Sequence, residues 1–183
     1  MATTKRAAKS SQASGGTRAV ARGPVSAGTQ IRGFVAKYTP DIAARMRDAR
    51  KRMRALFPRG CELVYDNHNA LAIGYASSER AADAILSIAA YPKWVTLFFL
   101  HGANLDDDPH GLLQGAGSRV RSIRLVPLTL FDDARVRALI KRALAPHAAA
   151  LRRAAPLRTI VKSVSARQRP RRPAPAAKRP TRG

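Results

Sequence analysis

The chain has 183 residues and a formal net charge of +23 at pH 7, from 34 Lys and Arg against 11 Asp and Glu. This length corresponds to about one domain with extensions. The single cysteine, Cys61, excludes an internal disulfide and any metal site built from several cysteines. The sequence has neither a run of about 18 apolar residues nor the apolar segment of a secretory signal. We therefore expect a cytoplasmic protein without a membrane span.

The charges are distributed unevenly along the chain. All acidic residues lie between Asp41 and Asp133, whereas residues 1–32 carry six basic residues and residues 151–183 carry eleven. The first segment is poor in large apolar residues, and the second ends in a run rich in Arg, Pro and Ala. We expect a disordered basic N-terminal arm at 1–32, a folded domain at 33–150 and a disordered basic C-terminal tail at 151–183.

The domain begins with a helix signal and ends with another. Thr39 is a favourable N-cap and Pro40 suits the first helical position, so a helix is predicted from there to Pro58. A last helix is predicted after Asp132 or Asp133. Alternating or β-branched runs predict strands between the helices, at 61–66, 70–75, 84–91, 94–100 and 119–126. This order predicts an α+β fold, in which an antiparallel sheet of about four to five strands is flanked by an N-terminal and a C-terminal helix.

Motifs within these elements resemble the YdhG-like family of small bacterial domains (domain of unknown function 1801). The resemblance covers about residues 40–145. The matching residues are Glu62, Tyr65, Tyr91, Lys93, Trp94, Val95, Leu97, Phe98, Gly115, Gly117, Ile123, Arg124, Leu139 and Ile140.

The resemblance implies an α+β fold with a curved antiparallel sheet. Some family members are described as frataxin-like iron chaperones, so it also implies metal handling as an alternative function. The chain departs from the family at Asp66-Asn67-His68, where members often have Gly-Met-Pro. A function tied to that turn is therefore not expected to carry over.

Candidate metal ligands lie in and around the loop that follows the strand predicted at 94–100. Carboxylate oxygens bind hard cations, and imidazoles favour iron or zinc. The loop is rich in Gly and lacks evident rigid support, so a solvated acidic loop paired with Arg119 and Arg121 is favoured, and a weak metal site is the alternative. We expect no tightly bound cofactor. The candidate ligands are His101, Asp106, Asp107, Asp108 and His110.

No catalytic arrangement is recognisable in the sequence. Glu62 with Tyr65 and Asp66 could supply acid and base groups, but no Ser or Cys stands beside a His in a known motif. We therefore interpret Glu62 as a carboxylate on the sheet surface paired with arginine, and we expect a protein that is not an enzyme.

A polyanion, above all nucleic acid, is the expected partner of the two basic segments. Flexible segments cannot hold side chains rigidly against base edges, so binding through phosphates with little sequence preference is predicted. The arginines of the helix predicted from Thr39 form either a further phosphate-binding face or an ordinary solvated face. The candidate nucleic-acid-binding residues are Lys5, Arg6, Lys9, Arg167, Arg169, Arg171, Arg172, Lys178, Arg179 and Arg182.

Overall fold

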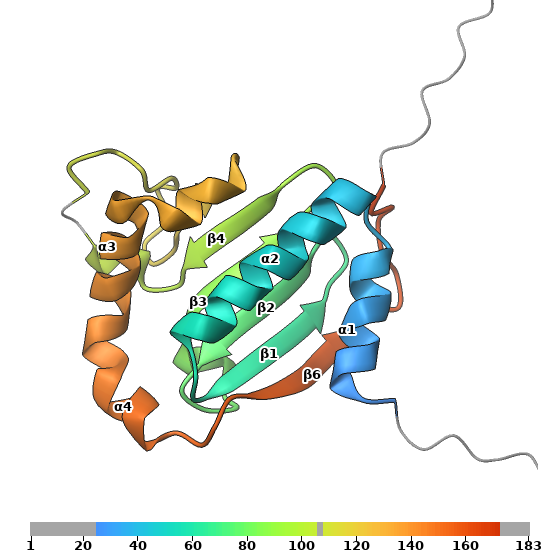
Figure 1. Cartoon of the computed structure of the whole chain (residues 1–183), viewed down its shortest axis with the longest axis horizontal. Coiled ribbons are helices and arrows are strands. Elements are labelled where there is room, and N and C mark those ends of the chain that lie inside the picture. The colour runs from blue at the N-terminus through green and yellow to red at the C-terminus, as the bar shows by residue number, and fades with distance from the viewer. Residues whose placement is uncertain (1–24, 106–107, 173–183) are drawn as a thin grey trace, which may run out of the picture.

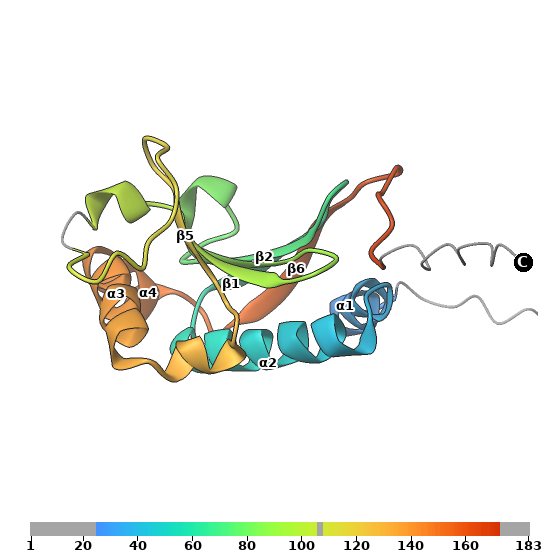
Figure 2. The same ribbon diagram turned by 90° about the horizontal axis from the view of Figure 1, so that it is seen from above.

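The computed structural model describes residues 25–105 and 108–172. The fold is α+β, with α1 and α2 packed on one face of a six-stranded sheet (Figures 1 and 2). The α-helices are α1 (Ala27–Ala36), α2 (Pro40–Leu56), α3 (Ala134–Leu144) and α4 (Ala148–Arg153). The strands are β1 (Cys61–Asp66), β2 (Leu71–Ala76), β3 (Ala84–Ala90), β4 (Val95–Phe99), β5 (Arg121–Arg124) and β6 (Arg158–Val164). Short 3-10 helices are η1 (Ala81–Asp83), η2 (Gly102–Asn104), η3 (Leu128–Asp132) and η4 (Ala145–His147).

The sheet is mixed, so the predicted antiparallel sheet of four to five strands is wrong in strand number and in direction. Its order is β5-β4-β3-β2-β1-β6. The five predicted strands pair antiparallel, but β6 pairs parallel with β1, with Cys61 opposite Arg158 and Asp66 opposite Val164. The chain crosses from β5 through α3 and α4 to the other edge of the sheet, and such a crossover permits a parallel strand.

The folded body extends past both expected boundaries, 33 and 150. At the N-terminal side, the Ser26 hydroxyl caps α1 by accepting a hydrogen bond from the Thr29 N–H at 3.2 Å. Helix α1 then buries Ile31, Phe34 and Val35. At the other end, α4 and β6 belong to the fold, and the chain continues in contact with it up to residue 172. The remaining parts of the expected arms, 1–24 and 173–183, lie outside the described residues.

Helix α2 supplies the centre of the core. It begins at Pro40, as predicted, although the Thr39 side chain makes no capping hydrogen bond. Met46, Ala49 and Met53 are completely buried against the sheet, at the helical spacing read from the sequence. Each buried methionine contributes about 1.5–3 kcal/mol relative to an exposed one. Among the described residues, no helix has the length and apolarity needed to cross a membrane.

Candidate nucleic-acid interface

A groove of about 510 Å³ between α1 and α2 has basic walls and an apolar floor. Ile31 and Val35 of α1 and Met46 of α2 form part of the floor. Among the described residues, no acidic side chain lines this basic groove. The basic residues that line it are Arg32, Arg47, Arg50, Lys51 and Arg54.

The spacing on α2 brings its basic residues to the groove. Arg47, Lys51 and Arg54 are four and three residues apart, so they share one face of the helix. The other cations of α2 are neutralised outside the groove. Arg45 pairs with Asp41 at 3.0 Å, and Arg52 pairs with Asp48 at 2.8 Å and with Asp132.

Two of the groove arginines are held from below by one carboxylate. Glu62 of β1 is 0% exposed, and Arg50 donates to both of its oxygens, at 3.0 and 2.8 Å. Arg54 donates to Oε2 at 2.6 Å, and so does the Thr159 hydroxyl of β6, at 2.6 Å. The Tyr75 hydroxyl donates to Oε1 at 3.0 Å. Five cations against one carboxylate leave the groove strongly positive.

Glu62 remains ionised despite its burial. Burial by itself would raise the pKa of its carboxyl, but the hydrogen bonds from Arg50 and Thr159 and the charges of Arg50 and Arg54 outweigh it and lower the pKa. Burial, and then the charge of Glu62, raise the pKa of Tyr75 well above its usual 10. The cluster therefore has fixed protonation near neutral pH, and it acts as a brace rather than as a proton donor.

The interpretation of Glu62 as a residue of the sheet surface is wrong, although its pairing with arginine is correct. Glu62, Val64 and Asp66 form the face of β1 that α1 and α2 cover, and all three are buried. A charged residue is tolerated on that face because basic side chains from the helices neutralise it.

Asp66 anchors the segment that follows β6. Its carboxylate pairs with Lys37 at 2.5 Å and with Arg171 at 3.2 Å. Arg171 is only 4% exposed and its guanidinium lies 5.6 Å from the centre of the Tyr38 ring. Arg172 donates to the carbonyls of Ala36 and Tyr38, at 3.1 Å each.

These contacts change the interpretation of residues 167–172, which were expected to lie in a solvated tail. The buried Arg171 cannot present its charge to an external phosphate, and the guanidinium of Arg172 is engaged by backbone carbonyls. Arg167 and Arg169 have exposed side chains. The other candidates lie outside the described residues, and they are Lys5, Arg6, Lys9, Lys178, Arg179 and Arg182.

Both ends of the described chain lie beside α1, which forms one wall of the groove (Figure 1). Val25 precedes the helix, and its carbonyl accepts a hydrogen bond from the Gln30 side chain at 2.9 Å. Arg172 contacts the last turn of the same helix. A helix of ten residues is about 15 Å long. The chain therefore continues into residues 1–24 from one end of α1 and into residues 173–183 from the other.

The candidate metal ligands are only partly described. Asp106 and Asp107 lie outside the described residues, and Asp108 accepts a hydrogen bond from the Leu113 N–H at 2.7 Å. His101 stacks on His147, with 5.7 Å between the ring centres. No group of three or more His, Cys, Asp or Glu that could hold a metal ion occurs within 25–105 and 108–172.

The pair formed by His101 and His147 was not foreseen from the sequence. Burial, and then the charge of His101, lower the pKa of His147. Arg32 was also missed as a groove residue, because the segment before residue 33 was assigned to the basic arm. The spacing of Ile31, Phe34 and Val35 is the signal that predicts the helix carrying Arg32.

Comparison of the chain with protein-family models, with curated proteins and with solved structures gave no match in any of the three. The resemblance to the YdhG-like family therefore stays a prediction.

Proposed function

We propose that the protein binds nucleic acid without a catalytic step, by holding phosphates in the basic groove between α1 and α2. The observation that carries the proposal is the set of five cations that line a groove of about 510 Å³ above one buried carboxylate. Guanidinium groups bind phosphate oxygens through paired hydrogen bonds. Glu62 holds Arg50 and Arg54 in place, so they lose less conformational freedom when an anion binds.

A polymeric anion fits this arrangement better than a small one. Residues 1–24 carry five basic residues and residues 173–183 carry three, with no acid in either segment. These charges continue from the two ends of α1, the helix that carries Arg32. A nucleic acid lying along the groove can contact the groove and both segments at once, which raises affinity by linkage.

Little sequence preference is expected. The basic side chains around the groove are suited to phosphates, and phosphate contacts position a nucleic acid without reading its bases. Binding should therefore weaken steeply with salt and depend little on base composition.

The proposal is tested by fluorescence anisotropy of a labelled 20-base-pair duplex, titrated with the full chain over a range of salt concentrations. The variant Arg47→Ala/Lys51→Ala removes two groove cations that form no ion pair with a described residue. Losing two phosphate contacts should reduce the slope of log K against log salt by about 2. Circular dichroism checks that the variant is folded.

A matched control separates the groove from net charge alone. The variant Arg80→Ala/Lys93→Ala also removes two exposed cations, from positions outside the groove lining. It should leave the salt slope nearly unchanged. If both double variants weaken binding equally, the groove is not the binding site, and binding that does not depend on salt would contradict phosphate contacts altogether.

A further inference from the structure

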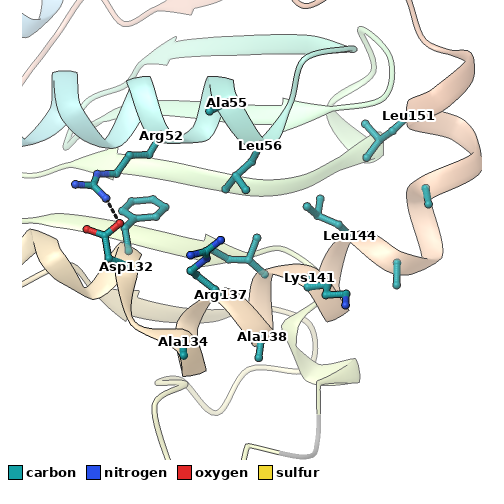
Figure 3. Close-up of a pocket in the computed structure, with 14 residues that line it drawn as sticks. Arg52, Ala55, Leu56, Asp132, Ala134, Arg137, Ala138, Lys141, Leu144 and Leu151 are labelled. Atoms are coloured by element: carbon teal, nitrogen blue, oxygen red, sulfur yellow. Dashed lines mark hydrogen bonds and ion pairs between the residues drawn. The ribbon is translucent and has the colours of Figure 1, made fainter.

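A second and larger groove, of about 890 Å³, lies between the C-terminal end of α2 and the α3–α4 segment (Figure 3). Its centre is apolar. Leu56, the last residue of α2, is 41% exposed, and its side chain points toward the same space as those of Leu144 and Leu151. Phe131, which is buried, also lines the groove. An apolar groove that several leucines line is a candidate surface for a partner.

The groove has the form that a helix fits. The lining residues of the α3–α4 segment recur at intervals of three and four from Ala134 to Leu151, and several of them are alanines. Within α3 this spacing places the lining residues on one side of the helix, and small side chains let a second helix approach closely. Helix α3 alone, with 11 residues, offers about 16 Å, or three helical turns, for contact.

The rim carries positive charge that the described part of the chain does not neutralise. Arg137 and Lys141 lie one helical turn apart on α3, have exposed side chains and form no ion pair with the described part of the chain. The acid in the lining, Asp132, is paired with Arg52 (Figure 3). Two like charges at this spacing repel each other and destabilise the helix, and an acidic partner would reduce this repulsion.

We propose that this groove binds an acidic amphipathic helix of a partner protein. Leucine-type side chains of the partner would lie on Leu56, Leu144 and Leu151, and its carboxylates would pair with Arg137 and Lys141. The chain's own segments 1–24 and 173–183 are poor occupants because they carry basic residues and no acid. A second copy would bring the same cations to the same groove and a further charge of +23.

The probe is a fluorescein-labelled helical peptide of about 18 residues, with Leu at positions spaced three and four apart and Glu elsewhere. Two peptides serve as controls, one with Gln in place of every Leu and one with Lys in place of every Glu. Titrated with the full chain at about 0.15 M salt, the acidic amphipathic peptide should bind about tenfold or more tightly than either control. Equal binding of the Gln peptide would mean that charge alone attracts it, and it would overturn the proposal.

Two variants locate the site. Leu56→Gln and Arg137→Glu/Lys141→Glu should each weaken binding of the acidic peptide about tenfold, and the charge reversal should increase binding of the Lys peptide. The altered side chains are exposed, so the fold should persist, and circular dichroism checks it.

Arg47→Ala/Lys51→Ala, in the basic groove between α1 and α2, should leave the affinity for the peptide within about twofold of that of the unaltered chain. The peptide site and the nucleic-acid site can therefore fail separately. Loss of peptide binding in this last variant would overturn the assignment of an acidic helix to the second groove. A dimer in sedimentation that Leu56→Gln dissociates would overturn it as well.

Discussion

Arg50 of α2 donates two hydrogen bonds to the carboxylate of Glu62 on β1, from Nε to Oε1 at 3.0 Å and from Nη2 to Oε2 at 2.8 Å. This paired contact joins the helical layer to the sheet beneath the basic groove between α1 and α2. Thr159 of β6 donates to the same carboxylate, so one buried group connects α2, β1 and β6. The stability of the fold and the shape of the groove therefore depend on Glu62.

Glu62→Gln should lower the free energy of unfolding by about 2–3 kcal/mol. Removing one partner of a fully buried ion pair costs about 3–5 kcal/mol, and partial exposure of Arg50 reduces the cost here. Denaturation in urea measures the change. Glu79→Gln is the matched control, because Glu79 pairs with Arg158 at 2.5 Å on the exposed surface. The control should cost less than about 1 kcal/mol, and equal costs would show that Glu62 is not a brace.

The stability of the protein should fall in acid, partly through Glu62. The pKa of Glu62 is lowered in the folded protein from its ordinary value of 4.5. Below pH 4.5 the carboxyl group of Glu62 therefore binds a proton more readily in the unfolded chain than in the folded protein. The stabilisation that ionised Glu62 provides is complete above its ordinary pKa of 4.5 and is lost as the pH falls through its pKa in the folded protein. Urea denaturation from pH 6 to pH 3 should therefore show a smaller loss for Glu62→Gln than for the wild type. Parallel curves would contradict the lowered pKa.

Tyr38→Phe should lower the free energy of unfolding by about 2 kcal/mol, because it leaves buried backbone groups unpaired. Tyr38 is 1% exposed, and its hydroxyl donates to the Ala90 carbonyl and accepts from the Leu71 N–H, both at 2.8 Å. Tyr91→Phe is the control, since that hydroxyl forms no hydrogen bond within the described residues, and it should cost less than about 0.5 kcal/mol. Thermal unfolding of both variants measures the change. Comparable losses of stability in the two variants would refute the role given to Tyr38.

The C-terminal end of the folded body can be located by truncation. A chain that ends at Arg172 should be as stable as the full chain. A chain that ends at Val164 should be less stable by about 3 kcal/mol, because it loses Arg171, a buried partner of Asp66. Thermal unfolding of the two truncated chains compares them directly. Equal melting temperatures would show that residues 165–172 add no stability and that the folded body ends with β6.

The sequence predicts the elements that local periodicity determines. Helical spacing predicts one buried face on α2, made of Ile42, Met46, Ala49, Met53 and Leu56. The first four are buried in the structure, whereas the prediction is wrong for Leu56, which is 41% exposed. Asp133 caps α3 as expected, with its carboxylate accepting a hydrogen bond from the Arg135 N–H. These elements are correct because the residues that define them lie within a few turns of one another.

The sequence fails where distant pairing decides. Strand β6 contains Thr159, Ile160 and Val161, a β-branched run, but the lack of acids and the prolines that follow favoured a disordered tail. Thr159 of this strand binds Glu62, which lies 97 residues earlier in the chain. The basic groove is not visible in the sequence either, because Arg32 and Arg47 line one groove only when α1 packs on α2.

Deletions of the two basic segments should reverse the order that composition predicts. Counting charges alone gives the larger effect to 151–183, with eleven basic residues against six in 1–32. Eight of the eleven belong to residues 151–172, which are described, and Arg171 among them is buried. Outside the described residues, 1–24 carries five basic residues and 173–183 carries three. Deleting 1–24 should therefore weaken duplex binding more than deleting 173–183.

The two deletions are compared by the slope of log K against log salt for the same labelled duplex. If every cation in a deleted segment contacts a phosphate, the slope falls by about 4.5 for 1–24 and by about 2.7 for 173–183, and partial contact reduces both values in proportion. The groove cations are intact in both chains, so salt-dependent binding should remain. Complete loss of binding on deleting either segment would show that the groove contributes nothing of its own, and the proposal would then have to move from the folded body to that segment.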